Sequence, residues 1–300
     1  MCQTQPTLSS PNLWCQAKQP CTNPADAPIG VFDSGVGGLS VLAHIMQALP
    51  HERYVYLADT LHVPYGGRSA ADIERLTIDA VRWLMAQGCK LVVIACNSAS
   101  AYGLQAVRQA FTQVPIVGLV PAIKPAVLAS QTRHIAVLAT PATLNGALLN
   151  TVIAQVAAPR GVTVSKYSLA SLVPWVEAGM PSGHVAVGEL ANLLDTLSAQ
   201  AVDYLVLGCT HYPFFQDYLR AQIAQTGARL TLIDSGGAIA RRVVSLLETA
   251  NLLRPPSDLP PLTLVTTGDI AQTQAVATRL LAQYLPPRVV EFQHCGLMAQ

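Results

Sequence analysis

Five apolar residues lead into a thiol, an amide and a hydroxyl in the stretch Leu91-Val92-Val93-Ile94-Ala95-Cys96-Asn97-Ser98-Ala99-Ser100. A short β-branched run of this kind is typical of a buried strand in a parallel sheet. Asn97 or Ser98 is expected to cap a helix that begins near Ala99. The stretch therefore predicts a strand, a polar loop and a helix, the repeating unit of an α/β fold.

Cys96 is expected at the carboxyl end of this strand, beside the helix N-terminus. Ligands of open α/β sheets bind at that end of the strands. Backbone N–H groups and the helix dipole there favour the thiolate, and a pKa lowered from about 8.5 to near 7 would supply about 2 kcal/mol. A lone strand-end cysteine is more often inert packing, so a reactive Cys96 needs support from a second motif.

A second stretch of the same design follows at Tyr204-Leu205-Val206-Leu207-Gly208-Cys209-Thr210-His211-Tyr212-Pro213. Here His211 stands two residues after the thiol. Residues 29–38 and 135–143 form a weaker pair, each reading as strand, polar loop and helix. Two such pairs predict a duplicated α/β domain in which each half contributes one cysteine.

The predicted fold class is α/β, with two similar parallel-sheet domains related by pseudo-symmetry and an active site in the cleft between them. Residues 1–28 are polar and lack the pattern of a signal peptide, so they are expected to be an N-terminal extension. The first domain is expected to be discontinuous, with residues 29–121 and 232–300, and the second to span residues 122–231.

Composition excludes several classes of function. The 300 residues carry a net charge of about +1 and no basic block, so no nucleic-acid footprint is present. No apolar run approaches the roughly 18–20 residues of a membrane span. The seven cysteines are odd in number and form no zinc-type CxxC pair. We expect no bound metal, free thiols and a reducing, cytoplasmic setting.

Two strand-end thiols that face each other across a cleft suit the inversion of a carbon that carries a proton. One thiolate removes the proton from one face while the other thiol delivers a proton to the opposite face. Neutral donors near the motifs can hold carboxylates without a lysine or arginine clamp. No lysine stands in a strand-end polar cluster, as a pyridoxal site would favour. No cofactor is therefore expected.

Four motifs together resemble the glutamate racemases of the aspartate/glutamate racemase family. They are Phe32-Asp33-Ser34-Gly35-Val36-Gly37-Gly38, Pro64-Tyr65-Gly66, Ala95-Cys96-Asn97-Ser98-Ala99-Ser100 and Gly208-Cys209-Thr210-His211-Tyr212-Pro213. The resemblance covers the chain from about Ile29 to its end. It implies cofactor-independent interconversion of L- and D-glutamate by a cytoplasmic homodimer, which supplies D-glutamate for peptidoglycan.

The resemblance also implies roles for individual residues. Cys96, assisted by Asp33, would deprotonate D-glutamate. Cys209, assisted by His211, would deprotonate L-glutamate, and Glu177 is implicated on that second side. The residues implied to line the substrate site are Asp33, Ser34, Pro64, Tyr65, Gly66, Asn97, Ser98, Thr140, Thr143, Thr210 and His211.

Two features set the chain apart from the common family pattern. Ser98 stands where the family commonly has threonine, so the hydroxyl is kept and a methyl group is lost. The N-terminal extension resembles those of members that a cell-wall nucleotide precursor activates, which makes such a precursor a candidate partner.

Three other functions fit parts of the pattern. A related racemase could act on aspartate or another amino acid, which isotope wash-in at Cα would reveal. A redox or zinc protein could use Cys96, Cys209 and His211, and would show a reversible disulfide or bound metal. A non-catalytic protein could use the same scaffold to bind a partner.

Overall fold

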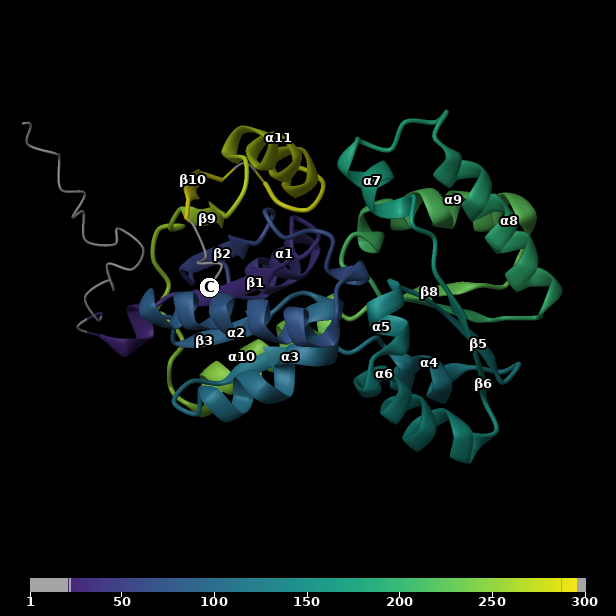
Figure 1. Ribbon diagram of the computed structural model, residues 1–300, viewed down its shortest axis with the longest axis horizontal. Helices are drawn as coiled ribbons and strands as arrows, with labels where there is room; N and C mark the ends of the chain where they lie inside the picture. The colour runs from purple at the N-terminus through teal and green to yellow at the C-terminus, as the bar shows by residue number, and fades with distance from the viewer. Residues whose placement is uncertain (1–20, 22, 287, 296–300) are drawn as a thin grey trace, which may run out of the picture.

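The computed structural model describes residues 21, 23–286 and 288–295. Most of the predicted N-terminal extension, residues 1–20 and 22, lies outside this part of the chain. Figure 1 shows two α/β regions side by side. We call them the first region (residues 23–118 and the described part of 236–295) and the second region (residues 123–233). No helix in the described ranges is long and apolar enough to cross a membrane.

The first region is a six-stranded parallel sheet with the order β10-β9-β2-β1-β3-β4. Its strands are β1 (Ile29–Asp33), β2 (Tyr54–Ala58), β3 (Leu91–Ile94), β4 (Ile116–Gly118), β9 (Leu262–Thr266) and β10 (Val290–His294). Its helices are α1 (Leu39–Ala48), α2 (Ala70–Ala86), α3 (Asn97–Ala110), α10 (Gly236–Thr249) and α11 (Ile270–Leu281). The C-terminal strands thus return to the first sheet, as the sequence predicts.

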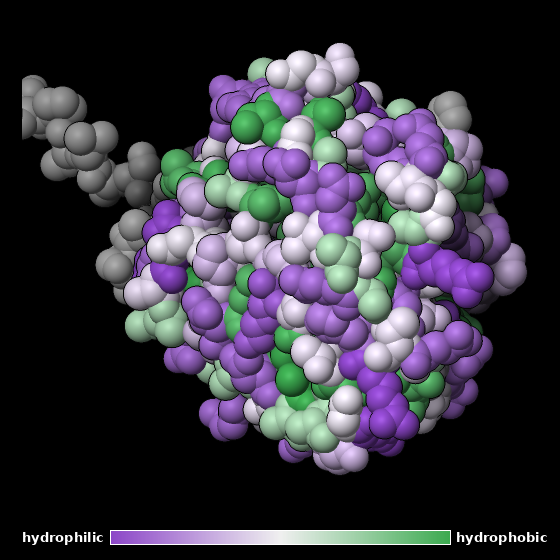
Figure 2. Space-filling model, turned by 90° about the vertical axis from the view of Figure 1, so that its right-hand side faces the viewer, coloured by the Kyte–Doolittle hydropathy of each residue, from purple (hydrophilic) through white to green (hydrophobic). Residues whose placement is uncertain are grey.

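The second region is a four-stranded parallel sheet with the order β6-β5-β7-β8. Its strands are β5 (His134–Leu138), β6 (Thr163–Tyr167), β7 (Tyr204–Leu207) and β8 (Thr231–Ile233). Its helices are α4 (Ile123–Ala129), α5 (Pro141–Asn145), α6 (Ala147–Val152), α7 (Leu172–Glu177), α8 (Val185–Ala199) and α9 (Gln216–Thr226). Figure 2 shows hydrophilic residues spread among apolar ones on the outer face of this region.

The two sheets share one strand order. When strands are counted from the start of each half, both sheets contain the order 2-1-3-4, and β9 and β10 extend only the first. This repetition confirms the predicted fold class of two parallel-sheet α/β units. The second sheet extends to Ile233, because β8 pairs with β7 there. The division at residues 121 and 231 stays a prediction.

Apolar side chains cover both faces of the central strands. One cluster joins α1, α10 and α11 to the first sheet and continues into the second region along α7, α8 and α9. A separate cluster packs α2 and α3 on the other face of the first sheet, and α4 packs on the second sheet. The near-continuous apolar runs of β1 and β3 follow from this double burial.

Helix α3 begins at Asn97, and its N-cap is Cys96 rather than Asn97 or Ser98. Cys96 has extended φ and ψ angles of −131° and 121°, the conformation that an N-cap requires. Its Sγ accepts the N–H of Ala99 at 3.4 Å. The predicted cap is therefore wrong. The N–H of Ala95 still donates to the carbonyl of Phe32 in the neighbouring strand, and the chain turns into the helix at the next residue.

The chain crosses between the regions twice, between β4 and α4 and between β8 and α10. The hydroxyl of Ser235 in the second crossing donates to the carbonyl of Val120 in the first at 2.7 Å. The two connecting segments therefore lie side by side, and both sheets direct their strand ends toward the shared interface (Figure 1).

Candidate active site

Asp33, Ser34 and Cys96 meet at the carboxyl edge of the first sheet. Asp33 is the last residue of β1 and Cys96 follows the adjacent strand β3. Cys96 Sγ lies 3.5 Å from the hydroxyl of Ser34. Asp33 Oδ2 accepts the N–H of Gly35 at 3.0 Å, which turns the loop back over the sheet edge. Adjacent parallel strands thus bring a thiol and a carboxyl group together from residues far apart in the sequence.

Burial controls the electrostatics of this half of the site. Burial and, second, the charge of Asp33 raise the pKa of Cys96 to about 12, although Ala99 and Ser34 act in the opposite direction. Burial also raises the pKa of Asp33, while the positive charge of His211 opposes that rise. The expected lowering of the Cys96 pKa is wrong, because the desolvation of a buried thiolate outweighs one helix N-terminus.

Cys209, His211 and Glu177 form a chain of acid–base groups in the second region. Cys209 follows β7, and its Sγ lies 4.0 Å from His211 Nδ1. His211 Nε2 lies 2.9 Å from Glu177 Oε1 at the end of α7. Burial lowers the pKa of His211, but Cys209 and Glu177 outweigh it and raise the pKa to about 10. Protonated His211 can therefore stabilise a thiolate at Cys209 and exchange a proton with it.

We expect wild-type stability to fall more steeply than that of His211→Gln as pH rises from about 6.5 to about 10. A pKa raised in the folded state gives stability that is complete below the unfolded value of about 6.5 and is lost as pH rises through about 10. Thermal midpoints measured across this range check the prediction. His51→Gln is the matched control and should parallel wild type. Equal slopes in wild type and His211→Gln would contradict it.

One loop of the first region, residues 33–38, reaches both cysteine motifs. Asp33 and Ser34 lie beside Cys96, whereas a Cβ atom on Gly37 would lie 2.3 Å from His211 Nδ1 and 2.6 Å from Thr210 Oγ1. The backbone is thus as close to the second region as it can be without a side chain.

Two further observations join the cysteine motifs at this interface. The hydroxyl of Ser40 donates to the carbonyl of Thr210 at 2.7 Å, which ties α1 to the Cys209 motif. Asn97 and Cys209 line one small cavity of about 10 Å³. The structure therefore places both thiol motifs at one interface rather than in unrelated parts of the molecule.

A row of hydroxyl groups crosses the interface. Ser98 Oγ lies 3.0 Å from Thr140 Oγ1, which lies 3.0 Å from Thr143 Oγ1. A Cβ atom on Gly66 would lie 3.2 Å from Thr140 Cβ, so the loop with Tyr65 also reaches this row. Tyr65 is buried, while Pro64 is exposed beside it. Ser98, Thr140 and Gly66 thus meet across the interface, and the substrate contacts that the sequence predicts for the site residues stay predictions.

Two buried oxygen atoms in the site have no hydrogen-bond partner among the described residues, Asp33 Oδ1 and Asn97 Oδ1. A buried acceptor without a donor is costly and uncommon in folded proteins. Each of the two atoms can therefore accept an N–H or O–H group from a ligand or from water.

Sequence reasoning missed two polar residues, Arg279 at the interface and Asp59, which accepts the hydroxyl of Tyr65 within the first region. Arg279 of α11 donates to the backbone carbonyl of Glu177 in the second region. No sequence signal links these positions, because they lie on separate elements. Asp59 directly follows β2, as Asp33 ends β1, so an acid after an apolar run was a signal that could have found it.

The thiols of Cys96 and Cys209 form no disulfide and belong to no metal-binding cluster of the described residues. Cys96 and Cys209 are both free. Within residues 21, 23–286 and 288–295, no group of three His, Cys, Asp or Glu residues is arranged to hold a metal ion. The arrangement offers two separate thiols, each with its own acid–base partner.

Comparisons with known proteins identify the family of this chain. The model of the Asp/Glu/Hydantoin racemase family matches residues 29–243. A glutamate racemase of Deinococcus radiodurans is 49% identical over 253 residues, which make up 84% of this chain and 86% of that protein.

Solved structures extend the comparison. Glutamate racemase from Francisella tularensis in complex with D-glutamate superimposes with a TM-score of 0.78 at 27% identity, covering 92% of this chain and 100% of that chain. Escherichia coli glutamate racemase, in complex with L-glutamate and the activator UDP-MurNAc-Ala, gives a TM-score of 0.75 at 31% identity, covering 91% and 100%.

Proposed function

Because the chain belongs to the Asp/Glu/Hydantoin racemase family, we propose that it interconverts L- and D-glutamate with Cys96 and Cys209 as the two bases. The observation that carries the proposal is the pairing of each free thiol with a carboxyl or imidazole group at one interface. Two bases on opposite sides of a carbon can move its proton in either direction.

The site suits a zwitterionic amino acid. Asp33 Oδ1 and Asn97 Oδ1 are buried acceptors, and an ammonium group supplies three donors. The ammonium charge would also offset the negative charge of Asp33, which contributes to the raised pKa of Cys96. Substrate binding would therefore make the thiolate easier to form at the moment it is needed.

Carboxylate groups of the substrate have neutral donors on both sides of the interface. The hydroxyl of Thr140 lies 3.0 Å from that of Ser98 and 3.0 Å from that of Thr143. Thr210 lies against the loop of Gly37. The N-terminus of the 14-residue helix α3 adds backbone N–H groups. Such donors bind a carboxylate without a cationic side chain.

The proton transfers balance in both directions. From D-glutamate, Cys96 gives its own proton to Asp33, and the resulting thiolate removes the Cα proton. Cys209 delivers its thiol proton to the opposite face of the carbanion, and protonated His211 stabilises the thiolate left behind. The product is L-glutamate, and the reverse reaction exchanges the roles. Glu177 orients His211 through the contact at Nε2.

The wider setting of the reaction is part of the same proposal. We place the chain in the cytoplasm as a homodimer that supplies D-glutamate for peptidoglycan, as the resemblance implies. UDP-MurNAc-Ala is a candidate activator, because it is the activator bound in the Escherichia coli glutamate racemase structure.

Deuterium uptake from D₂O is the direct test of the proposed reaction. We expect L-glutamate to gain deuterium at Cα and to lose optical activity without added pyridoxal phosphate or metal, because the two thiols exchange protons with solvent. Proton NMR and circular dichroism measure the two changes, with and without UDP-MurNAc-Ala. L-aspartate is the competing substrate. Uptake into aspartate with inert glutamate would contradict the proposal and favour the aspartate alternative.

A further inference from the structure

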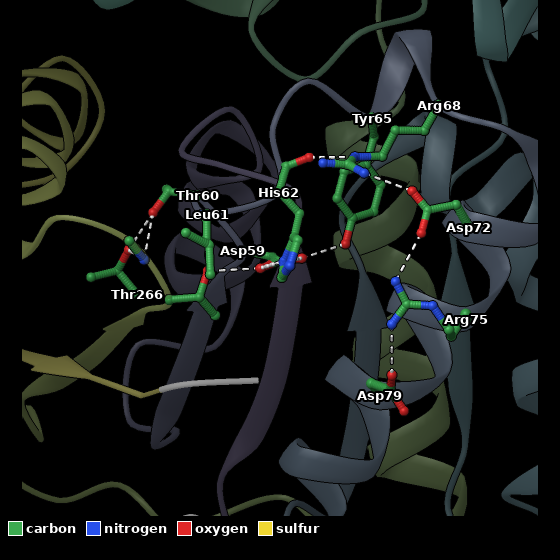
Figure 3. A network of polar contacts seen from close by, with 12 residues as sticks. Asp59, Thr60, Leu61, His62, Tyr65, Arg68, Asp72, Arg75, Asp79 and Thr266 are labelled. Atoms are coloured by element: carbon green, nitrogen blue, oxygen red, sulfur yellow. Dashed lines mark hydrogen bonds and ion pairs between the residues drawn. The ribbon is translucent and has the colours of Figure 1, made fainter. Parts of the chain in front are cut away.

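Asp59, directly after β2, is a fully buried carboxylate that the proposed reaction does not use. Three side chains donate to it: the Tyr65 hydroxyl at 2.7 Å, the Thr267 hydroxyl at 2.7 Å and His62 Nδ1 at 2.8 Å. Figure 3 shows His62 and Tyr65 converging on it from one loop. A buried charge is stable only when it is paired or hydrogen-bonded in this way.

The three donors come from different parts of the first region. His62 and Tyr65 belong to the loop of residues 60–68, whereas Thr267 follows β9 and also accepts the N–H of Leu61 at 3.0 Å. The backbone N–H of Asp59 donates to the carbonyl of Asp33 at 3.0 Å. Asp59 therefore joins the loop to β9 and to the strand that carries Asp33.

The same loop lies beside the proposed substrate site. The ring of Tyr65 packs on Phe32, with centroids 6.3 Å apart, in the apolar cluster that contains Cys96. The next residue, Gly66, lies against Thr140 of the second region. Because the Tyr65 hydroxyl donates to Asp59, it cannot donate to a ligand at the same time.

We infer that Asp59 is a positioning residue that fixes residues 64–66 against Thr140 and so preforms the rim of the glutamate site. The inference rests on the proposed function. The role needs a carboxylate, because a carboxylate only accepts hydrogen bonds and has room for three donors. An asparagine of the same shape would turn an N–H group toward one of these donors.

The test compares wild type with Asp59→Asn, Tyr65→Phe and the double variant. Each single variant should raise KM for glutamate by about tenfold with kcat nearly unchanged, since a hydrogen bond to a charged group is worth roughly one factor of ten or more. A rise in KM alone indicates lost binding rather than lost chemistry. The double variant should be no worse than Asp59→Asn, because both remove one coupled contact.

Two further measurements make the experiment decisive. Calorimetry should show the same weakening of D-glutamate binding without any turnover. Asp79→Asn is the matched control, because Asp79 belongs to the row of ion pairs that runs from Arg68 through Asp72 and Arg75, away from Asp59 (Figure 3), and continues to Arg82. Its KM should equal that of wild type.

The outcomes separate the inference from the function on which it rests. The role of Asp59 would be overturned if Asp59→Asn left KM unchanged, whether or not kcat fell. Additive effects in the double variant would also overturn it. Both outcomes leave the racemase proposal intact. If Asp59→Asn fails to fold, an unchanged KM in Tyr65→Phe overturns the role. A wild-type chain that neither binds nor racemises glutamate overturns both proposals.

Discussion

Cys96→Ser and Cys209→Ser are each expected to slow the racemisation of glutamate by about 10²- to 10⁴-fold, the usual contribution of a positioned acid or base. A serine hydroxyl keeps nearly the shape of the thiol, but it is a much weaker acid and so forms far less of the anion that removes a proton. L- and D-glutamate have equal free energies, so kcat/KM must fall equally in both directions. The role of each thiol therefore has to be read from an isotope effect.

In Cys96→Ser the step at residue 96 becomes the slow one. D-glutamate deuterated at Cα should then show a larger isotope effect than wild type, because residue 96 removes that deuteron. Deuterated L-glutamate should show a smaller effect, since Cys209 removes its deuteron rapidly and reversibly. Cys209→Ser should show the opposite pattern.

Cys89→Ser is the matched control, because Cys89 is another buried cysteine of the first region and lies outside the site. It should racemise glutamate at the wild-type rate. Near-wild-type rates in both active-site variants, or the same isotope pattern in both, would contradict the assignment of one thiol to each enantiomer.

Gly37→Ala is expected to lower the racemisation rate by about 10²-fold, the cost of displacing a reacting group by about 1 Å. Its added Cβ would lie 2.3 Å from His211 Nδ1 and 2.6 Å from Thr210 Oγ1, far inside normal contact distance. The collision can be relieved only if the loop of residues 33–38 or His211 moves. Either movement separates one thiol from its acid–base partner.

Gly35→Ala provides the matched comparison two residues away. A Cβ atom there would meet only Val63 Cγ1 at 3.5 Å, an ordinary van der Waals contact. Steady-state rates and thermal unfolding should show Gly35→Ala close to wild type, whereas Gly37→Ala should also lose about 1–3 kcal/mol of stability through overpacking. Full activity in Gly37→Ala would show that the two regions do not need this close approach.

The sequence predicted the fold because its strongest signals are local. The apolar runs at 91–95 and 204–207 end in similar polar residues, and this similarity indicated two related sheets. The matching strand orders confirm that prediction, and the family match confirms the resemblance. Boundaries such as the start of α3 were harder to predict, because a thiol that acts as an N-cap is indistinguishable in sequence from one that ends a strand.

The electrostatics and the cross-region contacts could not be predicted from sequence. The raised pKa of Cys96 depends on burial and on the charge of Asp33, and the apolar cluster that contains Cys96 combines residues of β1, α2 and the loop of Tyr65. Glu177 alone reads as a solvated helix residue, and only the resemblance indicated a site role. The structure puts it 2.9 Å from His211 and fixes its carbonyl through Arg279. Such contacts depend on tertiary packing, which local patterns do not encode.

The bond between Ser235 and Val120 ties the two chain crossings together. Two further contacts join the regions beside the cysteine motifs, Ser98 with Thr140 and the loop of Gly37 with His211. A rotation of one region against the other would separate both pairs. The proposed site therefore depends on how the two regions dock as well as on how each one folds.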